Sequence, residues 1–79
     1  MKESEYLKSI GQNITRIRKK KGMTTVQLAD ECDMEKSNLI PIEKGRINAT
    51  ATTLLKIAKA LQVEVKELFN FWCLFQITK

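Results

Sequence analysis

Apolar residues recur at helical spacing in two long segments of this chain. In the first segment, residues three or four positions apart fall on one stripe of a helix of about sixteen residues: Leu7, Ile10, Ile14 and Ile17. In the second segment the i, i+3, i+4, i+7 pattern is complete: Leu54, Ile57, Ala58 and Leu61. Both patterns predict amphipathic helices that pack against a shared core.

Local signals predict where these helices begin and end. Thr24 followed three residues later by Gln27 has the form of a capping box, which starts a second helix. Thr50 is a suitable N-cap for the helix that carries the second stripe. Gly22 and Gly45 each follow a periodic segment, so we expect them to terminate the first and third helices.

Shorter apolar patterns predict three further helices. The second helix buries Leu28, Ala29 and Cys32 and closes around residues 33 and 34, and the third carries Leu39 and Ile42. A short fifth helix carries three apolar residues: Val65, Leu68 and Phe69. With a single proline and three glycines in 79 residues, few breaks interrupt these helices. The pattern therefore predicts one all-α domain.

Residues 70–79 form an apolar tail without helical or strand periodicity. Its large side chains, together with Phe69, would leave an apolar patch too large for a soluble monomer: Phe69, Phe71, Trp72, Leu74, Phe75 and Ile77. One hypothesis is that these residues close a homodimer, as a helix extension or as a strand paired across the two-fold axis. The alternative is that the tail folds back over its own core.

The charge balance favours a polyanionic partner. Fourteen Lys and Arg against nine Asp and Glu give a net charge of +5, although solubility alone also accounts for a charge of this size. Five basic residues crowd the end of the first helix: Arg16, Arg18, Lys19, Lys20 and Lys21. Such a cluster complements the helix dipole as a solvated end or faces phosphates.

Several classes of function lack the residues they need. Cys32 and Cys73 are far apart and the chain has no histidine, so we expect neither a metal site nor a disulfide. The chain has no histidine, no glycine-rich phosphate loop and no suitably paired acids, so we expect no catalytic residues. We also expect neither a cofactor nor a small-molecule ligand. The first residues lack the apolar core of a secretion signal. We therefore expect a cytoplasmic protein that does not contact membranes.

Two short helices joined by a tight turn and flanked by longer helices match the helix-turn-helix arrangement. Residues 10–69 also resemble the XRE family of Cro-like and phage-repressor transcription regulators. The resemblance lies in the order and spacing of six motifs: Ile17-Arg18, Gly22-Met23-Thr24, Leu28-Ala29, Ser37-Asn38-Leu39, Ile42-Glu43-Lys44-Gly45 and Thr53-Leu54-Leu55-Lys56-Ile57-Ala58-Lys59-Ala60-Leu61.

The resemblance implies a five-helix, lambda-repressor-like domain over residues 10–69, followed by the tail at 70–79. It further implies a bacterial or phage repressor that binds double-stranded DNA as a homodimer at a palindromic operator. Half-sites of such dimers lie one helical turn apart, about 34 Å. A protein-interaction module, such as the antitoxin of a toxin-antitoxin pair, is the alternative that the apolar tail favours.

By the same resemblance, the start of the third helix reads base edges. Lys36 would donate to guanine O6 and N7, whereas Ser37 donates or accepts and discriminates poorly. Ile40 and Pro41 would contact a thymine methyl group. The alternative is that these are exposed residues without a ligand.

The resemblance also implies phosphate contacts and a structural ion pair. The phosphate contacts would fix register and supply affinity without reading sequence: Thr25, Asn38, Lys44, Arg46 and Asn48. Arg18 and Glu43 match positions that pair across the first and third helices in this family. Arg18 as a further phosphate ligand is the alternative.

Three residues depart from the family pattern. Thr25 replaces a glutamine and has a shorter reach, and Asp33 replaces the turn glycine and adopts a left-handed backbone less readily. Pro41 falls inside the predicted recognition helix, where proline costs about 3 kcal/mol. We therefore expect this helix to be kinked or shortened.

Overall fold

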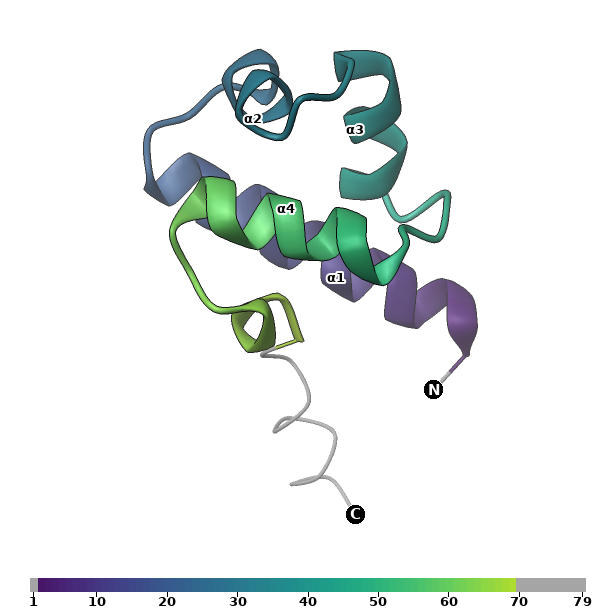
Figure 1. Cartoon of the computed structure of the whole chain (residues 1–79). Helices are drawn as coiled ribbons and strands as arrows, with labels where there is room; N and C mark the ends of the chain where they lie inside the picture. Colours follow the sequence, from purple (N-terminus) through teal and green to yellow (C-terminus); the bar gives the residue numbers. More distant parts are fainter. Residues whose placement is uncertain (1, 70–79) are drawn as a thin grey trace.

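The computed structural model describes residues 2–69, in which four α-helices and one 3-10 helix occur and no strand (Figure 1). These elements are α1 (Glu3–Lys20), α2 (Thr25–Glu31), α3 (Lys36–Glu43), α4 (Ala51–Leu61) and η1 (Val65–Phe69). The predicted all-α class and the order of five helical elements are confirmed. The fifth element is a five-residue 3-10 helix rather than an α-helix.

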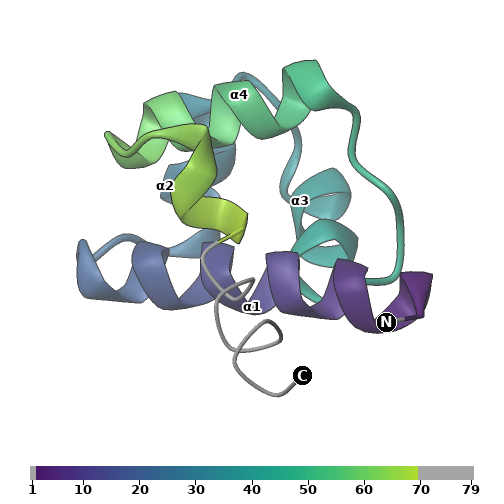
Figure 2. The same cartoon turned by 90° about the horizontal axis from the view of Figure 1, so that it is seen from below.

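The helices pack around a frame made by α1 and α4. The short helices α2 and α3 lie side by side on one side of this frame, and η1 lies on the other (Figure 1). Seen after a turn of 90°, η1 sits between α1 and α4 (Figure 2). The last described residue, Phe69, therefore lies on the side of the frame that faces away from the α2–α3 pair.

Side-chain caps start α2 and α4 as the sequence predicts. The Thr24 hydroxyl accepts from the Gln27 amide at 3.1 Å, and the Thr24 amide donates to Oε1 of Gln27 at 2.8 Å. Both halves of the capping box are thus present. The Thr50 hydroxyl accepts from the amide of Thr53 at 3.2 Å. Each contact satisfies a donor that the helix itself leaves unpaired.

All four α-helices end in the same hydrogen-bonded turn, the Schellman motif, in which one residue has a left-handed backbone. The left-handed residues have φ between 56° and 74°: Gly22, Asp33, Gly45 and Gln62. In α2, the amide of Met34 donates to the Ala29 carbonyl at 3.0 Å, across Asp33. Gly22 and Gly45 thus end their helices as predicted, and Asp33 adopts the strained conformation expected of it.

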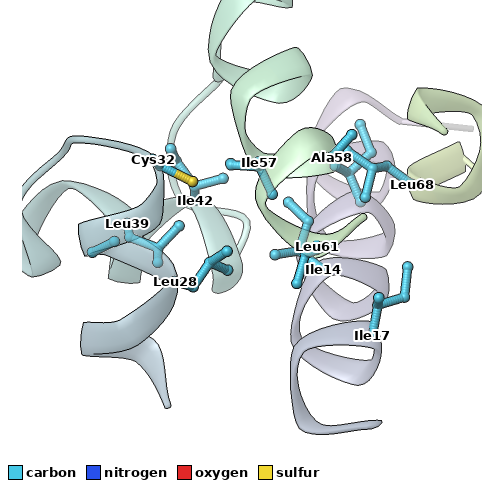
Figure 3. Close-up of a cluster of buried hydrophobic side chains, with 12 residues drawn as sticks. Ile14, Ile17, Leu28, Cys32, Leu39, Ile42, Ile57, Ala58, Leu61 and Leu68 are labelled. Atoms are coloured by element: carbon cyan, nitrogen blue, oxygen red, sulfur yellow. The ribbon is translucent and has the colours of Figure 1, made fainter. Parts of the chain in front are cut away.

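The core lies where α1, α2, α3, α4 and η1 meet (Figure 3). Its largest fully buried side chains come from all five elements: Ile14, Leu28, Leu39, Ile57, Leu61 and Leu68. Leu7 and Leu54, which the periodicity assigns to the same stripes, are half-buried at the edge. Cys32 is buried as predicted, and this burial, aided by the nearby Glu31 carboxylate, raises the pKa of its thiol.

Candidate nucleic-acid interface

The first three residues of α3, Lys36, Ser37 and Asn38, present their side chains to solvent. Lys36 and Ser37 are exposed, while Leu39 and Ile42 bury the opposite side of the helix. At 100° per residue, five residues share the outward side, which we call the α3 outer face: Lys36, Ser37, Ile40, Pro41 and Lys44. The four residues expected to read bases therefore lie together, with one of the expected phosphate ligands beside them.

Pro41 lies inside α3, and the helix continues through it to Glu43. The expected shortening at this residue does not occur. Pro41 supplies no amide proton to the carbonyl of Ser37. Its own carbonyl accepts from the Arg46 amide at 2.9 Å, in the turn that ends the helix. Because Pro41 stands within the last turn, only a short stretch of helix follows the missing hydrogen bond.

A buried ion pair fastens α3 to α1. Nε of Arg18 donates to Oε2 of Glu43 at 2.9 Å, and Nη2 of Arg18 donates to Oε1 at 3.2 Å. The two side chains are only 10% and 8% exposed. Nη1 of Arg18 donates to the Met23 carbonyl at 2.9 Å, and the Thr15 hydroxyl donates to Oε1 of Glu43 at 3.3 Å. The pair expected from the sequence is therefore present, and the Arg18 guanidinium is engaged inside the protein.

Two glycines let α1 and the end of α3 approach closely. A Cβ added to Gly11 would lie 2.6 Å from the carbonyl oxygen of Ile42. A Cβ added to Gly45 would lie 2.5 Å from Cα of Lys8, and Gly45 also needs its left-handed φ of 71°. The backbone at the end of α3 thus lies directly against α1. This contact fixes the distance between α1 and the α3 outer face.

The structure brings some of the expected phosphate ligands together and separates others. Thr25 and Lys44 line one hollow of about 380 Å³ between α1, α2 and α3, together with Ile40. Arg46 and Asn48 are exposed in the loop after α3. Asn48 lines a different hollow, with Tyr6, Leu7, Ile10, Leu54 and Phe69. Thr25 is therefore the phosphate candidate from outside α3 that lies beside the α3 outer face, next to Ile40 and Lys44.

The basic residues at the end of α1 do not form one continuous surface. Arg18 is buried with Glu43, whereas Arg16, Lys20 and Lys21 line a hollow of about 460 Å³ beside Val63 and Glu67. Helical spacing explains the division, because adjacent residues point in directions 100° apart. Most of this charge thus lies near η1 and away from α3.

Phe69 is the one residue of the expected dimer contact that the structure describes. It is half-buried, and its ring meets that of Tyr6 edge to face, with centroids 6.1 Å apart. Part of this side chain therefore belongs to the domain core. The other expected contact residues lie outside the described residues: Phe71, Trp72, Leu74, Phe75 and Ile77.

Sequence reasoning missed two residues that lie against α3 or at its start. Gly11 carries no signal in the apolar stripe, because its importance comes from a contact with a helix some thirty positions away, beyond the reach of local pattern rules. Glu35 is the N-cap of α3 and stands next to Lys36. Its position directly before the expected readout residues is a sequence signal that could have identified it.

Within residues 2–69, no helix is both long and apolar enough to cross a membrane.

Comparison with known proteins identifies the family. A family model described as helix-turn-helix matches residues 14–68. The control protein C.BamHI of Bacillus amyloliquefaciens is 39% identical over 62 residues, which cover 77% of this chain and 76% of that protein. The immunity repressor of Bacillus phage phi105 is 40% identical over 57 residues, and the match covers 72% of this chain but only 40% of the repressor.

A solved structure agrees with these relatives. The restriction-modification controller protein C.AhdI from Aeromonas hydrophila superposes with a TM-score of 0.77 at 32% identity, covering 78% of this chain and 94% of that one. The sequence and structural matches both extend over most of this chain and include the α2–α3 pair. The chain belongs to the XRE-type helix-turn-helix family, whose members are DNA-binding transcription regulators and not enzymes.

Proposed function

We propose that this protein is a cytoplasmic repressor that binds a palindromic operator in double-stranded DNA as a homodimer. The observation that carries the proposal is the setting of α3. Its first three residues are exposed, with Lys36 and Ser37 outward, while its other end is fixed to α1 by the Arg18–Glu43 pair. A rigidly held helix with a polar, basic first turn fits the major groove.

Within this proposal, the α3 outer face divides into two roles. Lys36 and Ser37, at the start of the helix, contact base edges, and Ile40 and Pro41 add apolar contact to thymine methyl groups. Lys44, at the other end of the same face, and Thr25, across the shared hollow, contact phosphates. Asn38, in the first turn of α3, and Arg46 and Asn48, in the loop after the helix, extend the phosphate contacts.

The names of the relatives favour a role in the control of transcription. Two of them are named as control or controller proteins and one as a phage immunity repressor. In this chain, the described residues end at Phe69, on the side of the α1–α4 frame away from α2 and α3. A dimer contact that begins there leaves the α3 outer face free, so two copies can read half-sites about 34 Å apart.

A selection from random or genomic duplexes with the purified full chain tests this function. We expect enrichment of an inverted repeat whose half-site centres are about one helical turn apart, with affinity that falls steeply as salt increases. Recovery of no enriched motif at moderate salt would contradict the proposal. In that case a pull-down for a protein partner would test the alternative role as an interaction module.

A further inference from the structure

The geometry points to Glu35 as a specificity-determining residue that selects an amino-bearing base, cytosine or adenine, in the operator half-site. The inference rests on the proposed function and deepens it. Glu35 immediately precedes the expected readout residues and is the N-cap of α3, with an extended backbone at φ −80° and ψ 147°. Its side chain is exposed beside them.

The carboxylate of Glu35 is free to face outward. An N-cap side chain usually turns back to accept from the amides of the first helical turn, yet Glu35 makes no such hydrogen bond. Only its backbone carbonyl takes part, accepting from the amides of Asn38 and Leu39. The carboxylate instead accepts from the Ser37 hydroxyl at 3.4 Å. This contact places the Glu35 carboxylate next to the side chain of a residue on the α3 outer face.

Charge makes this position selective. An exposed carboxylate that approaches a polyanion makes the binding free energy less favourable unless it finds a hydrogen-bond donor. In the major groove, the only base donors are N4 of cytosine and N6 of adenine, whereas guanine and thymine present the acceptors O6 and O4. Glu35 therefore attracts an amino group and repels a keto group at the base that it faces. Lys36 has the opposite preference, because its ammonium group only donates.

Glu35 and Lys36 together thus read neighbouring positions in complementary ways. We expect a position in each half-site that accepts cytosine or adenine and rejects guanine and thymine, adjacent to a position that prefers guanine. The rejection comes from repulsion, so it separates related operators even where the attraction itself adds little affinity.

The test compares Glu35→Gln with the unaltered full chain in the same duplex selection. Glutamine keeps the length of the side chain but both donates and accepts, so it no longer repels keto groups. We expect the preference for amino over keto bases at one half-site position to fall by about fivefold or more, a change of the size expected for one base contact. Preferences at the remaining positions should persist.

Glu31→Gln is the matched control, because it removes the same charge from an exposed residue that lies beside Asp33, Lys56 and Lys59 instead of the α3 outer face. It should leave every base preference unchanged. Glu35→Ala, which removes both the charge and the hydrogen-bonding groups, should also lose the rejection of keto bases and serves if Glu35→Gln does not fold. Circular dichroism of each variant separates a loss of folding from a loss of selectivity.

An unchanged preference at every position in Glu35→Gln would overturn the inference while leaving the proposed function intact. An equal loss in Glu31→Gln would also overturn it, because the effect would then come from overall charge. If the unaltered chain enriches no motif at all, the proposed function itself fails and the inference fails with it. These three results are distinguishable within one set of selections.

Discussion

Lys36 and Lys44 carry the same charge on one face of α3, but they lie at opposite ends of the helix. If Lys36 contacts a guanine, Lys36→Ala weakens the preferred operator by about 1 to 3 kcal/mol and relaxes its sequence preference. If Lys44 contacts a phosphate, Lys44→Ala weakens all duplexes alike and reduces the salt slope by about 1. Fluorescence anisotropy on the operator and on a scrambled duplex, over a range of salt, measures both effects.

These two variants control for each other, because each removes one exposed lysine and one positive charge. Equal losses on operator and scrambled DNA for both variants would contradict the division of α3 into a base-reading and a phosphate-binding end. A selective loss in Lys44→Ala would reverse the assignment.

Arg18 and Glu43 form the one buried ion pair that the described residues contain. Removing one partner leaves the other charge buried without compensation, so Arg18→Ala should lower the free energy of unfolding by about 3 to 5 kcal/mol. The Met23 carbonyl also loses its donor in this variant. Urea denaturation followed by circular dichroism measures the change.

Glu43→Gln is the informative companion variant, because the amide oxygen still accepts from the guanidinium and little volume changes. It should cost less than Arg18→Ala, since a neutral partner retains a charge-assisted hydrogen bond. The double variant Arg18→Met with Glu43→Leu should recover much of the loss, because it leaves no charge buried. A loss below about 1 kcal/mol in Arg18→Ala, the size typical of an exposed pair, would contradict this interpretation.

At the level of elements, the helices end with one motif but with different residues. Gly22 and Gly45 suit the left-handed position, whereas Asp33 and Gln62 carry a Cβ there, which costs roughly 1 to 2 kcal/mol. Gln62 is exposed, and within residues 2–69 its side chain makes no hydrogen bond. Gln62→Gly should therefore stabilise the protein by about 1 kcal/mol, after the extra flexibility of glycine in the unfolded chain is offset.

Gln62→Ala is the matched control, because it removes the same side chain but keeps the Cβ. Thermal unfolding of both variants should show a higher midpoint for glycine alone. A gain in both variants would mean that the glutamine side chain, and not the backbone conformation, is the source of strain.

Sequence patterns predicted the helices because their causes are local. The capping box at Thr24 and Gln27 and the i, i+3, i+4 stripes act within a few residues, so a linear reading finds them. The third helix was harder, because Pro41 opposes it locally. The contacts that hold α3 come from other helices, among them the ion pair between Glu43 and Arg18 of α1 and the close approach of Gly11 in α1. Tertiary contacts of this kind override local propensity.

At the scale of the whole molecule, the candidate site was predicted only in part. Spacing alone places Lys36, Ser37, Ile40 and Pro41 on one face of a helix, and the structure agrees. The basic run at residues 16–21 reads as one patch along the sequence. In three dimensions it divides between the ion pair with Glu43 and the surface near η1. That division depends on which helices cover α1, and single-sequence patterns do not contain this information.

The whole-molecule prediction concerns the dimer. If residues after the domain close it, deletion of residues 71–79 should give a folded monomer that binds a half-site weakly. The deletion keeps Phe69, because its ring packs on Tyr6 and its loss would disturb the domain itself.

Sedimentation analysis of the full and shortened chains measures their mass, and circular dichroism checks that the helices remain. A dimer forms its operator contacts in pairs, so the monomer loses the gain that comes from binding two half-sites at once. A shortened chain that still sediments as a dimer would place the interface on the described domain, and the exposed apolar side chains of Ile47 and Leu55 would be the first residues to substitute.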